Sequence, residues 1–379
     1  MLISKAVKFR FYPNAEQIEQ LSRDFNAARF AYNTALDARS FCYRELGRSV
    51  SINECSKAIT ELKADPDYAW LNDASSTVIT QALRDLDTAF KNFFSGQAKY
   101  PNFRKKRGPQ AARYQLDQRQ IERTFNAATG FLKLPKLGAL KIKWSRPVPG
   151  IPKMATVSRD AVGDYFVSFS YEVEVEPAPP TGKAVGIDLG INGVAVTSDG
   201  DKSGNPKFIA KYQRQLKRAQ QTLSRRIKGS GRWHRARIRV AKIQRKIARC
   251  RTDFLHKLTS GLVQAYDVIG LEDLNISGML KNRCLSKAIA DVAAHELVRQ
   301  LTYKAQWLGK EIIQIDRWTR STGVCPDCGV IGERLPLKVR EWTCECGAEH
   351  DRDVAAAQTI LNIALGSRVT AHREIPAAV

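Results

Sequence analysis

The period of the hydrophobic pattern divides the first 180 residues into strands and helices. Apolar and polar residues alternate over residues 3–11, which predicts a strand. A capping box, Asn14 with Gln17, then begins the first of three segments with helical spacing, at residues 15–36, 52–62 and 75–94. Alternation returns in three further stretches, at residues 139–144, 155–158 and 165–176. We predict a small β-barrel from residues 1–14 and 127–180, with a helical domain, residues 15–126, inserted after its first strand.

A proline-rich linker, residues 177–182, precedes a second series of elements. Its opening hairpin has an apolar strand at 184–187, a glycine-rich turn and a second strand at 194–196. We expect a third short strand at 208–210, two helices within 211–265, and then a strand, a helix, a strand and a closing helix, at 268–274, 288–308, 311–315 and 354–365. Gly366 is expected to end the last helix. This order predicts an RNase H-like α/β fold, a mixed sheet with helices on both faces.

Three acidic residues lie where elements of this predicted sheet begin or end. Asp188 ends the first strand, Glu272 lies near the end of strand 268–274, and Asp353 begins the closing helix. Asp351 lies two positions earlier, about 200° around the helix, so only one of the two can face the sheet. We assign Asp351 as the helix cap and Asp353 as the third site residue. Carboxylates in these positions hold two Mg²⁺ ions for phosphodiester hydrolysis in RNase H-like nucleases.

Asp188 has two other interpretations. It could be a solvent-exposed acid at a strand end, which would need no cation. The motif Asp-Leu-Gly also opens the nucleotide-binding hairpin of actin-like ATPases and sugar kinases. That fold needs a second glycine-rich hairpin with its own aspartate, and we find none in this sequence.

Four of the eight cysteines form a cluster with zinc-ligand spacing. Cys325 and Cys328 form a Cys-x-x-Cys pair, and fifteen residues later Cys344 and Cys346 form a Cys-x-Cys pair. Four thiolates predict one structural, tetrahedral Zn²⁺, with His350 as an alternative ligand. The other cysteines are scattered among helical patterns and are expected to be reduced and mostly buried, at positions 42, 55, 250 and 284.

The net charge of +23 is concentrated in one segment. Residues 202–252 contain 18 Lys and Arg and no acid. Such a segment predicts a nucleic-acid partner, and a helix pair that presents it would follow the phosphate backbone without reading sequence. The expected contacts from this pair are Arg225, Arg226, Arg232, Arg235, Arg239 and Lys242. A solvated helical hairpin is the alternative, but such a hairpin usually carries glutamates for pairing.

A second basic stretch, Tyr100 to Arg107, interleaves aromatic and cationic residues around a proline. We predict nucleic-acid contacts from Tyr100, Arg104, Lys105 and Lys106. A solvated basic loop is the alternative. The nearby aromatic residues are interpreted as core, namely Trp70, Phe90, Phe93 and Phe94. No apolar run reaches the roughly 18 residues of a membrane span, and the N-terminus lacks a signal-peptide core. Since the cysteines also suggest no disulfide framework, we expect a reducing cytosol.

Several motifs resemble those of the TnpB family, encoded by IS200/IS605 and IS607 transposons and related to the compact type V (Cas12-like) CRISPR nucleases. They are KAVKFRFYPNAEQ, QALRDLDTAFKNFFSG, GIDLGINGVAV, GLEDLNISGM, CPDC, TCECG and HDRDVAAA. The resemblance covers about residues 1–365. It implies an RNA-guided DNA endonuclease with a RuvC-like nuclease domain, in the cytoplasm of a prokaryotic cell and associated with the nucleoid. Its partners would be a transposon-derived guide RNA and double-stranded target DNA. It also implies catalysis by Asp188, Glu272 and Asp353, one departure being Ala355 where the family usually has asparagine.

The resemblance also suggests domain roles. The barrel and inserted helices would be the wedge and recognition domains, and the nuclease domain would comprise residues 181–318 and 349–366. A zinc-binding module, residues 319–348, and a flexible tail, residues 367–379, complete the prediction. A monomer is favoured. Two other functions are weighed: an RNA-guided DNA-binding repressor without cleavage, motivated by Ala355, and a transposase, disfavoured because no His-x-His pair lies beside a tyrosine.

Overall fold

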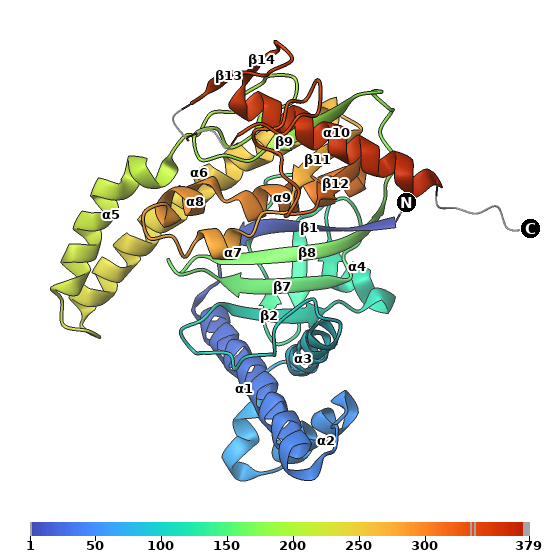
Figure 1. The fold of residues 1–379 in the computed structure, drawn as a ribbon. Helices are drawn as coiled ribbons and strands as arrows, with labels where there is room; N and C mark the ends of the chain where they lie inside the picture. Colours follow the sequence, from blue (N-terminus) through green and yellow to red (C-terminus); the bar gives the residue numbers. More distant parts are fainter. Residues whose placement is uncertain (1, 334–335, 337–338, 374–379) are drawn as a thin grey trace, which may run out of the picture. The chain divides into compact units, whose positions relative to one another are not determined.

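The computed structural model describes residues 2–333, 336 and 339–373 (Figure 1). Its contacts divide the chain into two units, which separate between Glu174 and Val175. None of the helices in the described ranges carries an apolar stretch long enough to cross a membrane.

A five-stranded antiparallel sheet organises the first unit, in the order β2-β7-β8-β1-β6. Its strands are β1 (Leu2–Phe11), β2 (Gln110–Gln115), β6 (Ile142–Lys143), β7 (Met154–Arg159) and β8 (Tyr165–Glu174). Short strands form a second sheet, β3 (Phe125–Asn126), β4 (Phe131–Leu134) and β5 (Gly138–Ala139). The outer strands β2 and β6 do not pair within the described residues, so the sheet is open where a closed barrel was predicted. Residues 110–115 also belong to this sheet and not to the predicted helical domain, because Ala112 and Tyr114 alternate into its core.

Helices cover part of this unit where the sequence predicted them. They are α1 (Ala15–Leu46), α2 (Ile52–Leu62), α3 (Ser76–Phe94) and the short α4 (Ile121–Thr124), with 3₁₀ turns at Pro66–Asp73 and Gln118–Gln120. The capping box of Asn14 and Gln17 is confirmed. Buried Asp24 connects α1 to β2 and to the start of α3. Its carboxylate accepts from Tyr114 Oη at 2.5 Å and from Ser75 N–H at 2.8 Å. Phe94 is 76% exposed and Trp70 is 37% exposed, so their assignment to the core was wrong.

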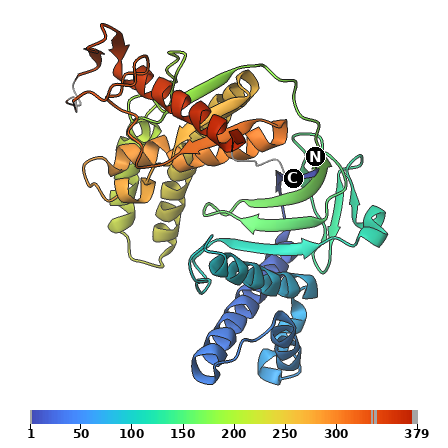
Figure 2. The ribbon, with the colours of Figure 1, turned by 45° about the vertical axis from the view of Figure 1, so that its right-hand side comes forward.

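The second unit is built on a mixed sheet with the order β10-β9-β11-β12 (Figures 1 and 2). Strands β9 (Ala184–Asp188), β11 (Val268–Glu272) and β12 (Glu311–Ile315) are parallel, and β10 (Val196–Thr197) is antiparallel to β9. Helices α6 (Gly231–Ala265) and α9 (Ala294–Leu308) cover one face, and α10 (Arg352–Arg373) crosses the other. The remaining elements are α5 (Phe208–Ser224), α7 (Ile276–Met279), α8 (Ser286–Val292), β13 (Glu341–Thr343) and β14 (Glu349–Asp351).

Three predictions for this unit were wrong. Residues 208–210 begin α5 and form no strand, because the Asp291 carboxylate accepts from Ile209 N–H at 3.0 Å and caps that helix. The helix predicted at 288–308 is divided at Ala293, whose φ of 51° interrupts the helical conformation. Gly366 does not end α10, which continues to Arg373, since one glycine costs a helix only about 1 kcal/mol. Residues 374–379 of the predicted tail lie outside the described residues.

Candidate functional site

Two glycines bring α10 into direct contact with the central strands. A Cβ built on Gly186 of β9 would lie 2.0 Å from the carbonyl oxygen of Ala357, and one on Gly270 of β11 would lie 3.1 Å from Ala364 Cβ. Only glycine allows a backbone approach this close. Since strand side chains alternate, Asp188 and Glu272, each two residues after its glycine, face the same side as α10.

Asp353 reaches this region from the first turn of α10. Asp351 caps the helix, as predicted, because its Oδ1 accepts from the backbone N–H of Asp353 and of Val354, both at 3.1 Å. Its other oxygen pairs with Lys202 Nζ at 2.7 Å. The Asp353 carboxylate pairs with Arg340 Nη1 at 3.2 Å and 3.3 Å. The two acids thus have different partners, and Asp353 is the one that interacts with the acids of the sheet.

The three acids share one electrostatic environment. The pKa of Asp188 is raised to about 7, first by burial and then by the charges of Glu272 and Asp353, while a hydrogen bond from the backbone N–H of Leu189 and the charge of Arg352 oppose the shift. Repelling carboxylates in a half-buried site are the donor set that divalent cations require. Among the described residues, the groups whose ligand atoms all lie within 4.8 Å of one another are those of the cysteine cluster described below, and the three acids are not one of them.

Ser321 is a residue of this site that sequence reasoning missed. It is 6% exposed, and its Oγ donates a short hydrogen bond to Glu272 Oε1. The serine lies between β12 and Cys325, so it links Glu272 to the cysteine cluster. No motif in the chain marks it. The glycine-x-acid repeat at 186–188 and 270–272 was a usable signal for the two strand acids, because it places both on one face of the sheet.

The four clustered cysteines meet in space. Cys325 Sγ lies 3.8 Å from Cys346 Sγ, and Cys328 Sγ lies 3.6 Å from Cys344 Sγ. All four sulfurs lie within 4.8 Å of one another. A tetrahedron with Zn–S bonds of about 2.3 Å has edges of about 3.8 Å, so these residues fit a zinc ion. His350 Nε2 lies 3.1 Å from Cys325 Sγ and, with Asp327, forms a second possible donor set.

The cysteine cluster is connected to the acidic residues through α10. Cys344 and Cys346 lie between β13 and β14, and β14 continues directly into α10. Asn362 Nδ2 donates to the carbonyl of Pro326 at 2.9 Å, which joins the other cysteine pair to the same helix. The position of Asp353 therefore depends on the geometry around the cysteines.

Comparisons with known proteins place the chain in a family. Residues 168–283 match the family OrfB_IS605, described as "Probable transposase", residues 295–360 match the Cas12f1-like TNB domain, and residues 1–48 match the helix-turn-helix domain of OrfB_IS605. A Streptomyces pristinaespiralis protein named provisionally as an RNA-guided DNA endonuclease is 43% identical over 369 residues, covering 96% of this chain and 90% of the relative. The chain belongs to the TnpB (OrfB_IS605) family.

Two further matches extend the TnpB comparison. InsQ of Escherichia coli K12, also named provisionally as an RNA-guided DNA endonuclease, is 31% identical over 378 residues, covering 94% of this chain and 91% of InsQ. A cryo-EM structure of a Cas12f1–sgRNA–target DNA complex matches with a TM-score of 0.58 at 12% identity, covering 95% of this chain and 99% of Cas12f1. The structural match shows that this TnpB chain shares the Cas12f1 fold.

The basic helix pair predicted at 211–265 is formed by α5 and α6. Its seam contains buried small and branched residues, among them Ala219, Ala236 and Val240. All six predicted nucleic-acid residues of the pair are exposed, namely Arg225, Arg226, Arg232, Arg235, Arg239 and Lys242. Ile227 lies in the turn between α5 and α6 and is 83% exposed.

The second predicted contact segment is partly held by the fold. Tyr100 Oη lies 2.7 Å from Ser40 Oγ, and its ring packs edge-on against Phe90 and Phe93. Arg104 pairs with Asp85 at 3.1 Å, and its guanidinium lies 3.8 Å from the centre of the Tyr32 ring. Lys105 and Lys106 are exposed. The lysines are therefore open to a ligand, while Tyr100 and Arg104 mainly shape the loop.

Proposed function

We propose that this chain is an RNA-guided, Mg²⁺-dependent DNA endonuclease of an IS200/IS605-type transposon. Its RuvC-like site would contain Asp188, Glu272 and Asp353. The observation that carries the proposal is the packing of α10, which bears Asp353, against Gly186 and Gly270 on the face of the sheet that presents Asp188 and Glu272. The raised pKa of Asp188, which results from burial and from the charges of the other two acids, agrees with this placement. Perturbed carboxylates of this kind are typical of catalytic sites. The names of the TnpB relatives, which cover nearly the whole chain, support the same activity.

The residues of the site have separate tasks in this proposal. Asp188 must lose its proton before it can bind a cation, and Ser321 holds Glu272 in one orientation. Asp353 must exchange its ion pair with Arg340 for metal coordination. Two Mg²⁺ ions, when bound, would activate water and stabilise the leaving oxygen of the phosphodiester. The alternation of β9 and β11 keeps the two strand acids on the face that α10 covers.

The cysteine cluster has a structural role in this proposal. Cys325, Cys328, Cys344 and Cys346 would hold one Zn²⁺ with no open coordination position, so this metal takes no part in chemistry. His350 remains the alternative ligand. Loss of zinc would release β13 and β14 and displace Asp353.

The nucleic-acid partners follow from the charge distribution. The exposed cations of α5 and α6 suit a sugar-phosphate backbone, and their contribution would fall with added salt. The guide RNA would supply sequence recognition by base pairing, and the cut would fall in double-stranded DNA beside a short flanking motif. A Cas12f1 bound to its RNA and DNA has the same fold, which supports both partners.

An RNA-guided DNA-binding protein without cleavage is the second candidate. Two observations favour it. Ala355, which is 3% exposed, provides no side-chain amide near the acids, and Arg340 already neutralises Asp353.

One experiment separates the two functions. A plasmid that carries the guide-matched target and flanking motif is incubated with the protein, guide RNA and Mg²⁺, in parallel with Asp188→Asn. Linear product from the wild type alone supports the nuclease. Retention of the plasmid in a gel-shift assay, with no linear product from either protein, would establish the repressor.

A further inference from the structure

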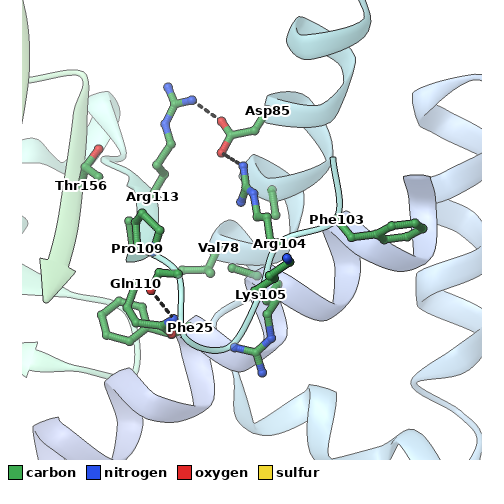
Figure 3. A pocket seen from close by; sticks show the side chains of 15 residues that line it. Phe25, Val78, Asp85, Phe103, Arg104, Lys105, Pro109, Gln110, Arg113 and Thr156 are labelled. Atoms are coloured by element: carbon green, nitrogen blue, oxygen red, sulfur yellow. Dashed lines mark hydrogen bonds and ion pairs between the residues drawn. The ribbon is translucent and has the colours of Figure 1, made fainter. Parts of the chain in front are cut away.

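A cavity of about 520 Å³ lies in the first unit, among α1, α3, β2 and the segment from Phe103 to Gln110, here called the basic loop (Figure 3). Part of its wall is apolar, from Phe25, Ala28, Val78 and Ala82. The volume lies in the range of about 300–1,000 Å³ that is typical of small-molecule sites. Phe103 extends away from the other labelled side chains and leaves the space open (Figure 3).

Arg29 lines this cavity and carries a guanidinium that is only partly hydrogen-bonded. Its Nη2 donates to Asn26 Oδ1 at 2.8 Å, but its Nη1 is buried and has no hydrogen-bond partner. An unpaired buried donor on a charged group is costly, so the guanidinium would gain from an acceptor that a small movement of its side chain brings within reach. A phosphate oxygen is a strong acceptor for a guanidinium.

The other polar residues make the cavity strongly cationic. Arg29, Arg104, Lys105 and Arg113 line it together with a single acid, Asp85. Both Arg104 and Arg113 bond to that acid from opposite sides, so its charge is already compensated (Figure 3). The remaining excess of positive charge favours an anion.

The basic loop is held in place without a ligand. Asn33 makes two hydrogen bonds to the backbone of Arg104, donating to its carbonyl at 2.9 Å and accepting from its N–H at 2.8 Å. Gln110 Nε2 donates to the carbonyls of Lys106 and Gly108, at 2.9 and 3.1 Å. A preorganised wall of this kind reduces the entropy cost of binding.

From these contacts we infer that the cavity binds one unpaired nucleotide of a nucleic-acid strand. The phosphate would contact Arg29 and Lys105, and the base would lie against the wall formed by Phe25 and Val78. An apolar wall beside a cationic group is the combination used for single-stranded nucleic acids. The inference rests on the proposed function for its ligand class, and the strand could be guide RNA or target DNA.

The test combines a protein variant with a nucleotide scan. The RNA that co-purifies with the protein is sequenced and synthesised, and each nucleotide of the RNA and of both target strands is replaced in turn by an abasic residue. Binding is measured for the wild type, for Arg29→Met and for Arg23→Met. Arg23 is the matched control because it lies on the same helix but is exposed and paired with Glu19. A second arm measures the binding of single-stranded RNA and DNA of about twelve nucleotides to the same three proteins in the absence of a guide.

We expect Arg29→Met to weaken binding about tenfold, as for the loss of one hydrogen bond between charged groups, and Arg23→Met to change it less than about twofold. One abasic position should weaken binding in the wild type and weaken it less in Arg29→Met, because the base and the phosphate of that nucleotide are held in one cavity and their contacts are coupled. That position identifies the strand as RNA or DNA. The melting temperature of Arg29→Met should equal or exceed that of the wild type, since an unpaired buried cation is removed.

The outcomes separate this site from the endonuclease activity. The site alone would be overturned by three results together. Guided cleavage is normal, Arg29→Met has no effect in either arm, and every abasic replacement has the same effect in Arg29→Met as in the wild type. A lower melting temperature that fully accounts for the lost binding would likewise assign Arg29 to folding. Oligonucleotide binding that depends on Arg29, without guided cleavage, would retain the site and reject the proposed function.

Discussion

Gly186 of β9 lies against Ala357 of α10 so closely that a Cβ on the glycine would be 2.0 Å from the alanine carbonyl oxygen. This contact fixes the distance between the strand that carries Asp188 and the helix that carries Asp353. The proposed nuclease site therefore depends on a residue that has no side chain and takes no part in chemistry.

Substitution of Gly186 should affect folding and activity together. Gly186→Ala forces α10 away from β9, and overpacking of this kind costs about 1–3 kcal/mol or more. Gly270→Ala, with its nearest contact at 3.1 Å, should be milder. Gly261→Ala in α6 is the control, because a Cβ at this position would meet nothing within 4 Å. This substitution should stabilise α6 by up to about 1 kcal/mol. Urea unfolding and plasmid cleavage measure the two effects, and equal stability of Gly186→Ala and wild type would contradict the contact.

The stability of the metal-free protein should depend on pH through Asp188. Folded Asp188 has a pKa of about 7, whereas an unfolded aspartate loses its proton near pH 4. The folded state therefore binds the extra proton between these values, and stability falls as the pH rises from about 4 to about 7. Asp188→Asn should remove this slope and be more stable than the wild type at pH 8, with Asp253→Asn as the exposed control. Thermal melts in EDTA across this range test it, and parallel pH profiles for the two proteins would reject the raised pKa.

Ser321 should act on cleavage by orienting Glu272. Ser321→Ala removes a hydrogen bond to a charged group, worth about 1.5–3 kcal/mol, so we expect cleavage to slow at least tenfold. The Mg²⁺ concentration for half-maximal rate should rise, while Ser321→Thr, which keeps the hydroxyl, should retain activity. Direct titration of the protein with Mn²⁺ provides a readout that does not depend on cleavage. An unchanged metal affinity in Ser321→Ala would leave the serine without a positioning role.

Removal of zinc should lower both melting temperature and cleavage, because β14 leads directly into α10. Cys328→Ser and Cys346→Ser should each lose the metal, whereas His350→Ala should retain one zinc per chain if the four sulfurs are the ligands. Cys284→Ser, an exposed cysteine outside the cluster, is the control. Zinc content is measured with a colorimetric chelator. If His350→Ala lost its zinc and Cys346→Ser kept it, His350 and not Cys346 would be the fourth ligand.

Neutralising the basic helix pair should change the salt dependence of guide binding. Replacement of Arg235, Arg237 and Arg239 by Gln should weaken the RNA complex and reduce the slope of log K against log salt by about 2–3, roughly 0.7–0.9 for each lost phosphate contact. Lys257→Gln, whose lysine is exposed on the same helix but paired with Asp253, is the control. Filter binding between 50 mM and 200 mM salt, roughly the range over which such contacts act, measures the slope. Identical slopes for the triple variant and the wild type would show that this face of α6 contacts no phosphate.

The local pattern of the sequence predicted most elements, but not how they end. The capping box at Asn14 and the period of residues 76–94 were sufficient for α1 and α3, because both signals act within a few turns. Ala293 and Gly366 show the limit. The backbone at Ala293 adopts a positive φ next to Asp291, which caps α5 about 80 residues earlier in the chain, and no local pattern contains that contact. Helix α10 passes through Gly366, where the local rule predicted a stop.

By itself the sequence determined the candidate residues for chemistry: a zinc-type cysteine spacing, three acids at element ends, and a positive segment without acids. Spacing and charge suffice for these because ligand type and helix geometry are local properties. Only the tertiary structure decided that Gly186 and Gly270 allow α10 to approach the sheet closely and that Ser321 holds Glu272. It alone also showed that Arg29 lines a cavity and that its Nη1 has no hydrogen-bond partner. These depend on close packing between segments distant in the chain, where tenths of an ångström decide the outcome and no sequence period records them.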